Sequence, residues 1–358
     1  MRFRLLVCSC LFAASLMADT GDAPLRLSVA GLVHGHVDGF FSAVKHRTDV
    51  QIVGIFDPDR DLQKKYASKY GFADAVFFTD VETMLVQTRP EAVAIFTATV
   101  DHAPMVEACA RHHIDAMMEK PLAVSMVEAR RIQRAAAASG IQVIVNYETT
   151  WYRSHHAMWQ LIKQQGQGGA IRKMVAMDGH EGPKEINVGP EFLSWLTDPV
   201  KNGAGALFDF GCYGANLMTW MMDNQRPLSV TATLQTFKPQ IYGRVDDEAN
   251  VLVEYPKAVG IIQGSWNWPY GRKDFEVYSE HGYAYAIGGN ELDTHAGAQK
   301  LEELPPDEKD SVSYLKAVVR GRLKAAGLSS LENNMIVVEI LEAARESGKT
   351  GKAVRLTP

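Results

Sequence analysis

The sequence predicts two domains: an α/β domain built on a parallel sheet, followed by an α+β domain with an open-faced, mainly antiparallel sheet. Between Leu25 and Val145, short apolar runs alternate with amphipathic segments, which is the pattern of successive βαβ units. After Asn146 the apolar–polar alternation lengthens and few helices intervene, which is typical of an antiparallel sheet with one covered face. A length of 358 residues also favours two domains over one.

The first domain is assigned to residues 24–148. Its strands are expected at Leu25–Ala30, Val50–Phe56, Ala75–Phe78, Ala92–Phe96, Ile114–Met118 and Ile141–Val145. Its helices are expected at Val37–His46, Arg60–Tyr70, Val81–Val86, Ala103–His112 and Ser125–Ser139. Gly71 and Gly140 follow two of these helices, where a residue in the left-handed region commonly ends a helix.

The second domain is assigned to residues 149–329, and residues 330–358 are expected to complete the fold as a helix and a short strand. Its strands are expected at Arg172–Met177, Ser229–Thr236, Ala249–Tyr255, Val259–Trp266, Asp274–Tyr278 and Tyr283–Ile287. Helices are expected at His155–Gln164, Ala206–Met222, Val312–Lys324 and Leu331–Glu346.

The composition is that of an ordinary globular protein, with 46% hydrophobic and 22% charged residues. The net charge of −5 and the lack of a dense Lys/Arg cluster argue against nucleic acid or an anionic membrane surface as a partner. No segment is long and apolar enough to span a bilayer. Outside the N-terminal leader, the two widely separated cysteines Cys109 and Cys212 form neither a disulfide framework nor a metal-ligand cluster.

Residues 1–18 are expected to be a signal peptide. Two arginines precede an apolar run from Leu5 to Met17, and Ala18 supplies a small residue before the cleavage position. This predicts an exported, periplasmic protein. The alternative is a frayed N-terminal helix or strand on a cytoplasmic protein. Export as an unfolded chain would require any bound cofactor to be acquired outside the cytoplasm.

The turn after the first strand contains Gly31, Val33, His34, Gly35 and His36. A Rossmann domain places glycines here so that the backbone can approach a pyrophosphate at a helix N-terminus. Gly31 fits the first glycine, whereas Val33 and His36 stand where the second and third are expected. The motif alone equally fits an ordinary strand–helix turn. Two histidines in one turn seldom bind a metal, and no metal is expected.

Asp57 ends the second strand, about 20 residues beyond the turn, where an acidic side chain takes the adenosine ribose hydroxyls of a dinucleotide. Its negative charge would repel a 2′-phosphate, which favours NAD over NADP. Arg60 leaves room for a phosphate. The alternative role of Asp57 is to cap a helix that has Pro58 at its first position.

Two further strand ends carry polar residues. Thr97, Thr99 and His102 follow one strand, and Glu119 and Lys120 follow the next. Ligands of open α/β sheets bind outside the carboxyl ends of the strands, so these side chains are candidates to face a nicotinamide. A lysine there can remove a hydroxyl proton, because desolvation and nearby charges lower its pKa. The alternatives are a helix start for the first group and a surface salt bridge for the second.

Asp209 and Tyr213 are four residues apart and would share one face of a helix. An acid and a phenol on one face can both reach a polyhydroxylated substrate. An ordinary amphipathic helix accounts for the same spacing.

Taken together, these residues resemble the glucose-fructose oxidoreductase/inositol dehydrogenase (Gfo/Idh/MocA) family over about Leu25 to Leu356. The resemblance rests on the Gly31 turn, Asp57, the stretch 97–102, the Glu-Lys-Pro motif at 119–121 and the Asp-x-Gly-x-Tyr segment at 209–213, with support from Gly264-Ser265-Trp266 and the last helix. Val33 and His36 depart from the glycine pattern of the family, which leaves the pyrophosphate contacts open.

The resemblance implies that Lys120 is the catalytic lysine, that Asp209 contacts substrate hydroxyls, and that Tyr213 replaces the histidine of most members. It places Glu148, Arg153 and His180 at the substrate pocket, where each is alternatively a polar residue near the interdomain cleft. It further implies a bound NAD, with NADP less favoured, a carbohydrate or polyol substrate, and a homo-oligomer formed through the open sheet face.

The function expected on these grounds is hydride transfer between a sugar or polyol carbon and a bound nicotinamide, with Lys120 and Tyr213 handling the hydroxyl proton. One alternative is an NAD-dependent glycoside hydrolase or lyase that works by transient sugar oxidation and elimination, which predicted export favours because free NAD is scarce outside the cytoplasm. A second is a non-enzymatic sensor on the same scaffold, against which the presence of Lys120 and Asp209 argues.

Overall fold

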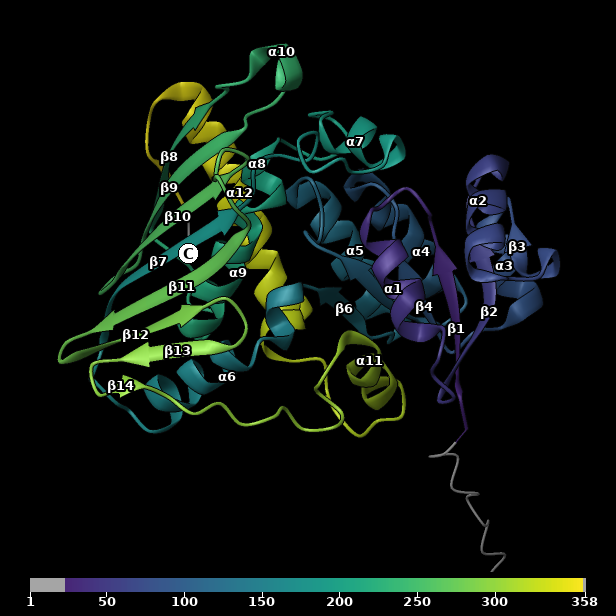
Figure 1. Cartoon of the computed structure of the whole chain (residues 1–358), viewed down its shortest axis with the longest axis horizontal. Coiled ribbons are helices and arrows are strands. Elements are labelled where there is room, and N and C mark those ends of the chain that lie inside the picture. The colour runs from purple at the N-terminus through teal and green to yellow at the C-terminus, as the bar shows by residue number, and fades with distance from the viewer. Residues whose placement is uncertain (1–22, 357–358) are drawn as a thin grey trace, which may run out of the picture.

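The computed structural model describes residues 23–356, so the predicted leader at 1–18 lies outside the described residues. Two sheets form two halves of the molecule, and helices fill the space between them (Figure 1). The predicted fold, an α/β half followed by a half with a mainly antiparallel sheet, is confirmed. Within the described range, no helix has the length and apolar character needed to cross a membrane.

The first half is a Rossmann sheet of six parallel strands in the order β3-β2-β1-β4-β5-β6. β1 lies between β2 and β4, so the sheet is extended from β1 in both directions. Where the strand order reverses in this way, a crevice forms beyond the carboxyl ends of the strands. The strands are β1 (Leu25–Ala30), β2 (Val50–Phe56), β3 (Phe77–Phe78), β4 (Ala92–Ile95), β5 (Asp115–Glu119) and β6 (Val143–Asn146).

Local signals account for the helices of this half. The side chains of Asp59, Asp80 and Ser125 cap three helices, and Gly71 and Gly140 end two of them in the left-handed conformation. The predicted strand Ala75–Phe78 is wrong in its first half, because Asp74–Val76 form a 3-10 turn and only the last two residues pair with β2. The helices are α1 (His36–Val44), α2 (Arg60–Tyr70), α3 (Val81–Thr88), α4 (His102–Arg111) and α5 (Met126–Ser139).

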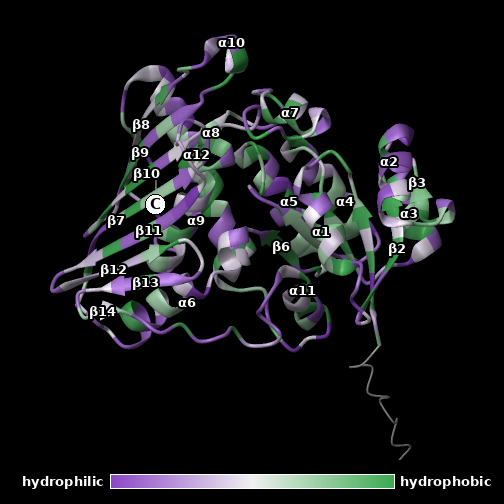
Figure 2. Ribbon diagram, in the orientation of Figure 1, coloured by the Kyte–Doolittle hydropathy of each residue, from purple (hydrophilic) through white to green (hydrophobic). Residues whose placement is uncertain are grey.

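The second half is a nine-stranded sheet in the order β14-β13-β12-β11-β7-β10-β9-β8-β15, in which only β7 and β10 are parallel. Its central strands carry hydrophobic and hydrophilic residues in alternation (Figure 2). The strands are β7 (Ile171–Gly179), β8 (Ser229–Gln235), β9 (Glu248–Glu254), β10 (Val259–Ser265), β11 (Arg272–Ser279), β12 (Gly282–Ile287), β13 (Glu291–Thr294), β14 (Gly297–Ala298) and β15 (Val354–Arg355).

Several helices of this half differ from the prediction. The single helix expected over Ala206–Met222 is broken at Phe210, which caps the second of two helices. The helix expected to reach Lys324 ends at Val319, shortly before Gly321 turns the backbone with φ of 69°. The helices are α6 (Arg153–Trp159), followed by a π-helix (Gln160–Gln164), α7 (Pro190–Leu196), α8 (Ala206–Asp209), α9 (Gly211–Met221), α10 (Pro239–Tyr242), α11 (Ser311–Val319) and α12 (Leu331–Thr350).

Helices join the two halves. α12 contacts β8 and α9 on one side and α5 on the other, and α11 packs Leu315 and Val318 into the core of the Rossmann half. The outer face of the large sheet carries exposed side chains that include Leu252, Tyr278 and Ile287, and no helix of the described chain lies over it (Figure 1). Assembly of a homo-oligomer through this face stays a prediction.

Candidate active site

The turn between β1 and α1 is pressed against the end of β4. Gly31 has φ of 93°, and a Cβ atom built on it would lie 2.7 Å from the Cγ2 atom of Thr97. Only glycine therefore allows the two strands to approach at this point. Thr97 takes part by packing beneath the turn, and its hydroxyl donates to the carbonyl of Ala98 at 3.1 Å.

A helix of the second half covers this turn. The buried ring of His34 packs against Phe192 and Trp195 of α7, with ring centroids 4.9 and 5.4 Å apart. The indole N–H of Trp195 donates to the carbonyl of Val33 at 3.2 Å. Burial lowers the pKa of His34 well below its ordinary value, so the ring is neutral. The sequence did not predict α7.

The first turn of α1 opens into a groove between the two halves. Gly35 is the N-cap residue and has no side chain to cap the helix. The N–H groups of His36 and Val37 are bonded by the side chain and the carbonyl of His34. What the first turn offers an anion is therefore the positive end of the helix dipole. The groove has a volume of about 430 Å³, and its lining includes Gly35, His36, Lys65, Lys120 and Asp209.

Asp57 lies at the carboxyl end of β2, directly beside the turn. Its carboxylate accepts the N–H groups of Leu32 at 2.7 Å and of Asp59 at 2.8 Å. Burial raises the pKa of this carboxyl above its ordinary value. The alternative role, capping of α2, is wrong, because the capping side chain is that of Asp59.

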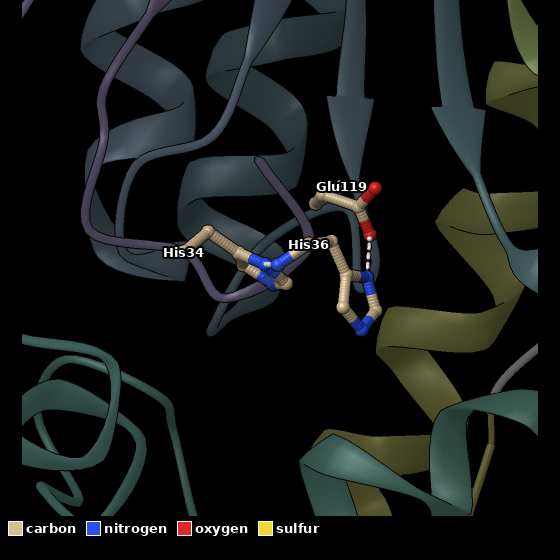
Figure 3. Close-up of side chains that lie close together, drawn as sticks. All are labelled: His34, His36 and Glu119. Carbon is tan, nitrogen blue, oxygen red and sulfur yellow. Dashed lines mark hydrogen bonds and ion pairs between the residues drawn. The ribbon is translucent and has the colours of Figure 1, made fainter. Parts of the chain in front are cut away.

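Figure 3 shows Glu119, at the end of β5, facing the ring of His36. One carboxylate oxygen of Glu119 pairs with His36 Nδ1 at 2.9 Å, and the other accepts from the amide of Asn146 at 2.8 Å. The ligand-type atoms of His34, His36 and Glu119 lie within 4.8 Å of one another. Since His34 Nδ1 also accepts the His36 N–H at 3.1 Å, we interpret the group as a hydrogen-bonded cluster.

Lys120 and Asp209 form a buried ion pair at the inner end of the groove. Lys120 Nζ donates to the Asp209 carboxylate at 2.6 Å and to its backbone carbonyl at 2.8 Å. The side chains are 4% and 7% exposed, and the indole of Trp266 donates to the second carboxylate oxygen at 2.9 Å. Burial disfavours both charges, but each charge stabilises the other, so the pKa of Lys120 is raised and that of Asp209 is lowered. The expected lowering of the Lys120 pKa is therefore wrong for this arrangement.

Tyr213 lies beside this pair, although it does not share a continuous helix with Asp209. Asp209 ends α8 and Tyr213 lies in the first turn of α9. The Nζ atoms of Lys120 and Lys273 lie 5.1 and 4.9 Å from the centre of the Tyr213 ring. Burial raises the pKa of Tyr213 well above its ordinary value, so the phenol keeps its proton.

A second cavity of about 590 Å³ opens on the sheet side of the pair. His180, Phe210 and Lys273 line both this cavity and the groove, which places them where the two spaces meet. Glu148 lines the cavity, forms an ion pair with Lys273 and accepts the Tyr152 hydroxyl at 2.6 Å. His180 Nδ1 accepts the N–H of Gly182 at 2.9 Å, so the neutral ring carries its proton on Nε2.

Three residues expected at the site line neither the groove nor the sheet-side cavity. The Thr99 hydroxyl lies 3.5 Å from the side-chain oxygen of Asn202, at the junction of the halves. His102 is fully buried and bonds the carbonyl of Pro121 at 3.1 Å, and burial lowers its pKa to about 4. The substrate role of Arg153 is not supported by its position, because it lines a separate cavity and pairs with Glu303.

Comparison with known families matches both halves of the chain. Residues 28–147 match the model described as "Oxidoreductase family, NAD-binding Rossmann fold", and residues 155–285 match the "GFO/IDH/MocA C-terminal domain". The chain belongs to the Gfo/Idh/MocA family.

Relatives of this Gfo/Idh/MocA protein include sugar and polyol dehydrogenases. The scyllo-inositol 2-dehydrogenase (NADP⁺) of Bacillus subtilis is 20% identical over 80% of this chain and 85% of its own length. The D-apiose dehydrogenase of Rhizobium rhizogenes is 21% identical over 88% of this chain and 94% of its own length. An inositol dehydrogenase homologue from Azotobacter vinelandii, solved with NAD⁺, shares the fold with a TM-score of 0.80 at 19% identity, covering 93% of this chain and 98% of its own.

Three side chains at the site of this family member were not among the predicted site residues. Lys273 reaches the site because β11 pairs with β7, which sets it opposite Asp178, and no motif surrounds it. Asn146 ends β6 next to Glu119. Trp266 belonged to a segment that was singled out, but its contact with Asp209 depends on the packing of β10 against α8.

Proposed function

We propose that this protein is an NAD-dependent oxidoreductase that transfers a hydride between a sugar or polyol carbon and the nicotinamide. The observation that carries the proposal is the Lys120–Asp209 pair, which lines the groove. His180, Phe210 and Lys273 line the same groove and also the sheet-side cavity. The groove suits a dinucleotide, and the cavity suits a small polar substrate. The relatives named above are dehydrogenases and oxidoreductases, and they do not favour the glycosidase alternative.

The residues of the Rossmann half fit a dinucleotide. The first turn of α1 at Gly35 and His36, where the helix dipole is positive, would hold the pyrophosphate. The close approach at Gly31 keeps side chains out of its path. Asp57 would hold the adenosine ribose, and its charge favours NAD over NADP. The nearby cations Lys65 and Lys69 are already paired with Glu191 and Asp38. When bound, the nicotinamide supplies or accepts the hydride.

The chain itself handles the proton. In the resting arrangement Lys120 is an ammonium held by Asp209, and Tyr213 is a neutral phenol. Both therefore carry the proton that a carbonyl oxygen needs as it becomes a hydroxyl. In the opposite direction Lys120 must first lose a proton, so oxidation of a hydroxyl is favoured at alkaline pH. Asp209 fixes the ammonium in place through two hydrogen bonds.

The sheet side would bind the substrate. The His180 Nε2–H group and the Lys273 ammonium are donors, and the Glu148 carboxylate is an acceptor. Lys273 and Glu148 pair with each other until a substrate hydroxyl takes the place of one of them. Donors and acceptors in alternation around a cavity suit the vicinal hydroxyls of a sugar or polyol.

The proposal is tested with purified protein, NAD⁺ or NADH, and a panel of sugars, polyols and keto-sugars. The expected result is a change in nicotinamide absorbance that Lys120→Met removes. Added acceptor sugar is included, because a tightly held cofactor would shuttle between two substrates without net change. If no member of the panel changes the absorbance in either direction, with or without acceptor, the proposal is wrong.

We further propose that the chain is exported after removal of residues 1–18, on the strength of the N-terminal pattern. N-terminal sequencing of the native protein tests this. A mature chain that begins near Asp19 supports export, and one that begins at Met1 excludes it.

A further inference from the structure

A third cavity, of about 490 Å³, lies apart from the groove and the substrate cavity. It is enclosed by α6, by the short helix Gly327–Ser329, and by the connection from β14 to α11, which we call the strap (residues 299–310). In Figure 1 the strap runs along the lower edge of the molecule between these elements. None of Lys120, Asp209 and Tyr213 lines this cavity, so the proposed reaction does not account for it.

Two indole rings form one wall of the cavity. Trp159 and Trp220 are stacked with centroids 5.6 Å apart and planes 10° apart, and both are half-buried. Gly327 lies against Trp220, and a Cβ atom there would stand 3.3 Å from its indole nitrogen. Trp151 and Tyr314, 5.5 Å apart, form another part of the lining. Flat aromatic faces of this kind accept the C–H face of a sugar ring.

The polar part of the lining is electrically balanced. Three basic and three acidic side chains contribute to it, namely Arg153, Lys300, Lys324, Glu302, Glu303 and Glu308. An anionic ligand such as a nucleotide would find no excess of positive charge. Donors and acceptors around aromatic faces suit a neutral polyhydroxylated ligand, and the volume lies within the range of small-molecule sites.

The backbone beside the indoles is irregular. After Trp159, α6 continues as the π-helix Gln160–Gln164, and Gln160 and Gln164 both line the cavity. A π-helical turn of this kind is uncommon and is frequently found at functional sites. It turns two amide side chains toward the space in front of the indole rings.

The cavity is connected to the cofactor turn by a chain of hydrogen bonds. The indole N–H of Trp151 donates to Asn146 at 3.0 Å, and the amide of Asn146 donates to Glu119 at 2.8 Å. Glu119 in turn pairs with His36 at 2.9 Å. An occupant that moves Trp151 therefore acts on a side chain that lines the groove.

We infer that this cavity is a second saccharide site, which binds a neutral mono- or disaccharide and adjusts the cofactor turn through Trp151. The binding site is inferred from the cavity alone, whereas its effect on the cofactor turn rests on the proposed function. By reciprocity, a saccharide that changes the affinity for NAD must have its own affinity changed by NAD to the same extent.

The first experiment measures binding by intrinsic tryptophan fluorescence in the full chain with Lys120→Met/Asp209→Asn, which prevents turnover without leaving a buried unpaired charge. The probes are glucose, xylose, methyl β-D-glucopyranoside, maltose and cellobiose, with glucose 6-phosphate as the anionic comparator. At least one neutral sugar is expected to bind, with an affinity that Trp159→Ala lowers about tenfold. Phe237→Ala, at an exposed aromatic residue far from the cavity in sequence, is the control.

If Trp159→Ala fails to fold, Gln160→Trp blocks the cavity from an exposed position and should abolish the same binding. The inference is overturned if no neutral sugar binds, if glucose 6-phosphate binds more tightly, or if binding is lost with Lys273→Met instead of with the cavity variants. The last result would assign the binding to the substrate cavity.

The second experiment measures NAD binding with and without the saccharide found in the first. We expect the saccharide to change the NAD dissociation constant about fivefold or more. Asn146→Leu breaks the chain of hydrogen bonds between Trp151 and Glu119 from outside the cavity, so it should preserve saccharide binding and abolish the change. An unchanged NAD affinity in the parent chain overturns the regulatory role. If the chain binds no NAD at all, the proposed function fails while the saccharide site is still tested.

Discussion

The two walls of the candidate active site are built differently. On the Rossmann wall, Asp57 and Glu119 are buried, and their carboxylate oxygens are held by partners from within the chain. On the sheet wall, Glu148 and Lys273 form an ion pair at the edge of an open cavity of about 590 Å³. The Glu148 side chain is 52% exposed, whereas that of Glu119 is 4% exposed.

This difference indicates what each wall does. Buried groups with fixed partners are pre-organised and suit a ligand that is the same in every cycle. The Glu148–Lys273 pair faces an open cavity through the exposed Glu148, so it exchanges partners at a lower cost than a fully buried pair. It suits a substrate that enters and leaves. Lys120 and Asp209 join the walls, since one residue comes from each half of the chain.

The largest effect is expected where the walls meet. Lys120→Met should lower kcat about 10²–10⁴-fold, because it removes the proton donor from the reacting oxygen. It also leaves Asp209 buried without its partner, which destabilises the fold. The double variant Lys120→Met/Asp209→Asn separates the two effects, since it should regain stability and remain inactive. A double variant with restored activity would show that the lysine only balances a charge.

A change to the sheet wall should act on the substrate. Lys273→Met is expected to raise the KM for the sugar about tenfold while kcat stays within about threefold. The measurement is a steady-state kinetic comparison of Lys273→Met with Lys120→Met and with the wild type. If kcat falls as far as in Lys120→Met, the two lysines share the chemistry, and the division between the walls is incorrect.

A change to the Rossmann wall should act on the cofactor. Asp57→Ala is expected to raise the KM for NAD about tenfold, because the ribose hydroxyls lose their acceptor. It should also reduce the preference for NAD over NADP. Asp59→Ala is the matched control, since it removes the cap of α2 without touching the turn. It should cost about 1 kcal/mol of stability and leave the cofactor preference unchanged. Equal effects of both variants on the preference would contradict the role of Asp57.

The smallest effect concerns Asp178, which is buried beneath the sheet wall without a hydrogen-bond partner among the described residues. Burial raises its pKa well above the ordinary value. In the unfolded chain Asp178 therefore loses its proton near pH 4, whereas in the folded chain it keeps the proton to a higher pH. The free energy of unfolding falls as the pH rises from about 4 toward the pKa of the folded chain. Relative to Asp178→Asn, the free energy of unfolding of the wild type should fall by up to about 1.4 kcal/mol between pH 5 and pH 6.

Urea unfolding of both proteins across this pH range measures the difference. Asp74→Asn, at an exposed position, should leave the pH dependence nearly unchanged. A wild type and an Asp178→Asn variant with parallel profiles would mean that Asp178 is ionised in the folded chain.

The Rossmann wall could be predicted from the sequence because its signals are local. The strand Val50–Phe56 and the helix Arg60–Tyr70 match residue by residue, since an apolar run, a cap and a terminal glycine mark them. The strand-end residues Asp57, Glu119 and Lys120 follow from the rule that parallel strands present their carboxyl ends at one edge.

The sheet wall could not be predicted in the same way. Lys273 gains its place from the register of β11 on β7, and α7 gains its place by packing on a turn more than 150 residues earlier, as the bond from Trp195 to Val33 shows. The protonation of Lys120 depends on Asp209, 89 residues away. Distant pairings of this kind leave no periodicity in the sequence.

The position of α7 has a consequence for kinetics. Phe192 lies so close to Gly35 that a Cβ atom there would stand 3.0 Å from its ring, and the same helix covers His34. A phosphate group that reaches the first turn of α1 must therefore pass a side chain from the opposite half of the molecule. Dissociation from the groove should then depend on how readily Phe192 moves aside, and a ligand of modest affinity can still dissociate slowly.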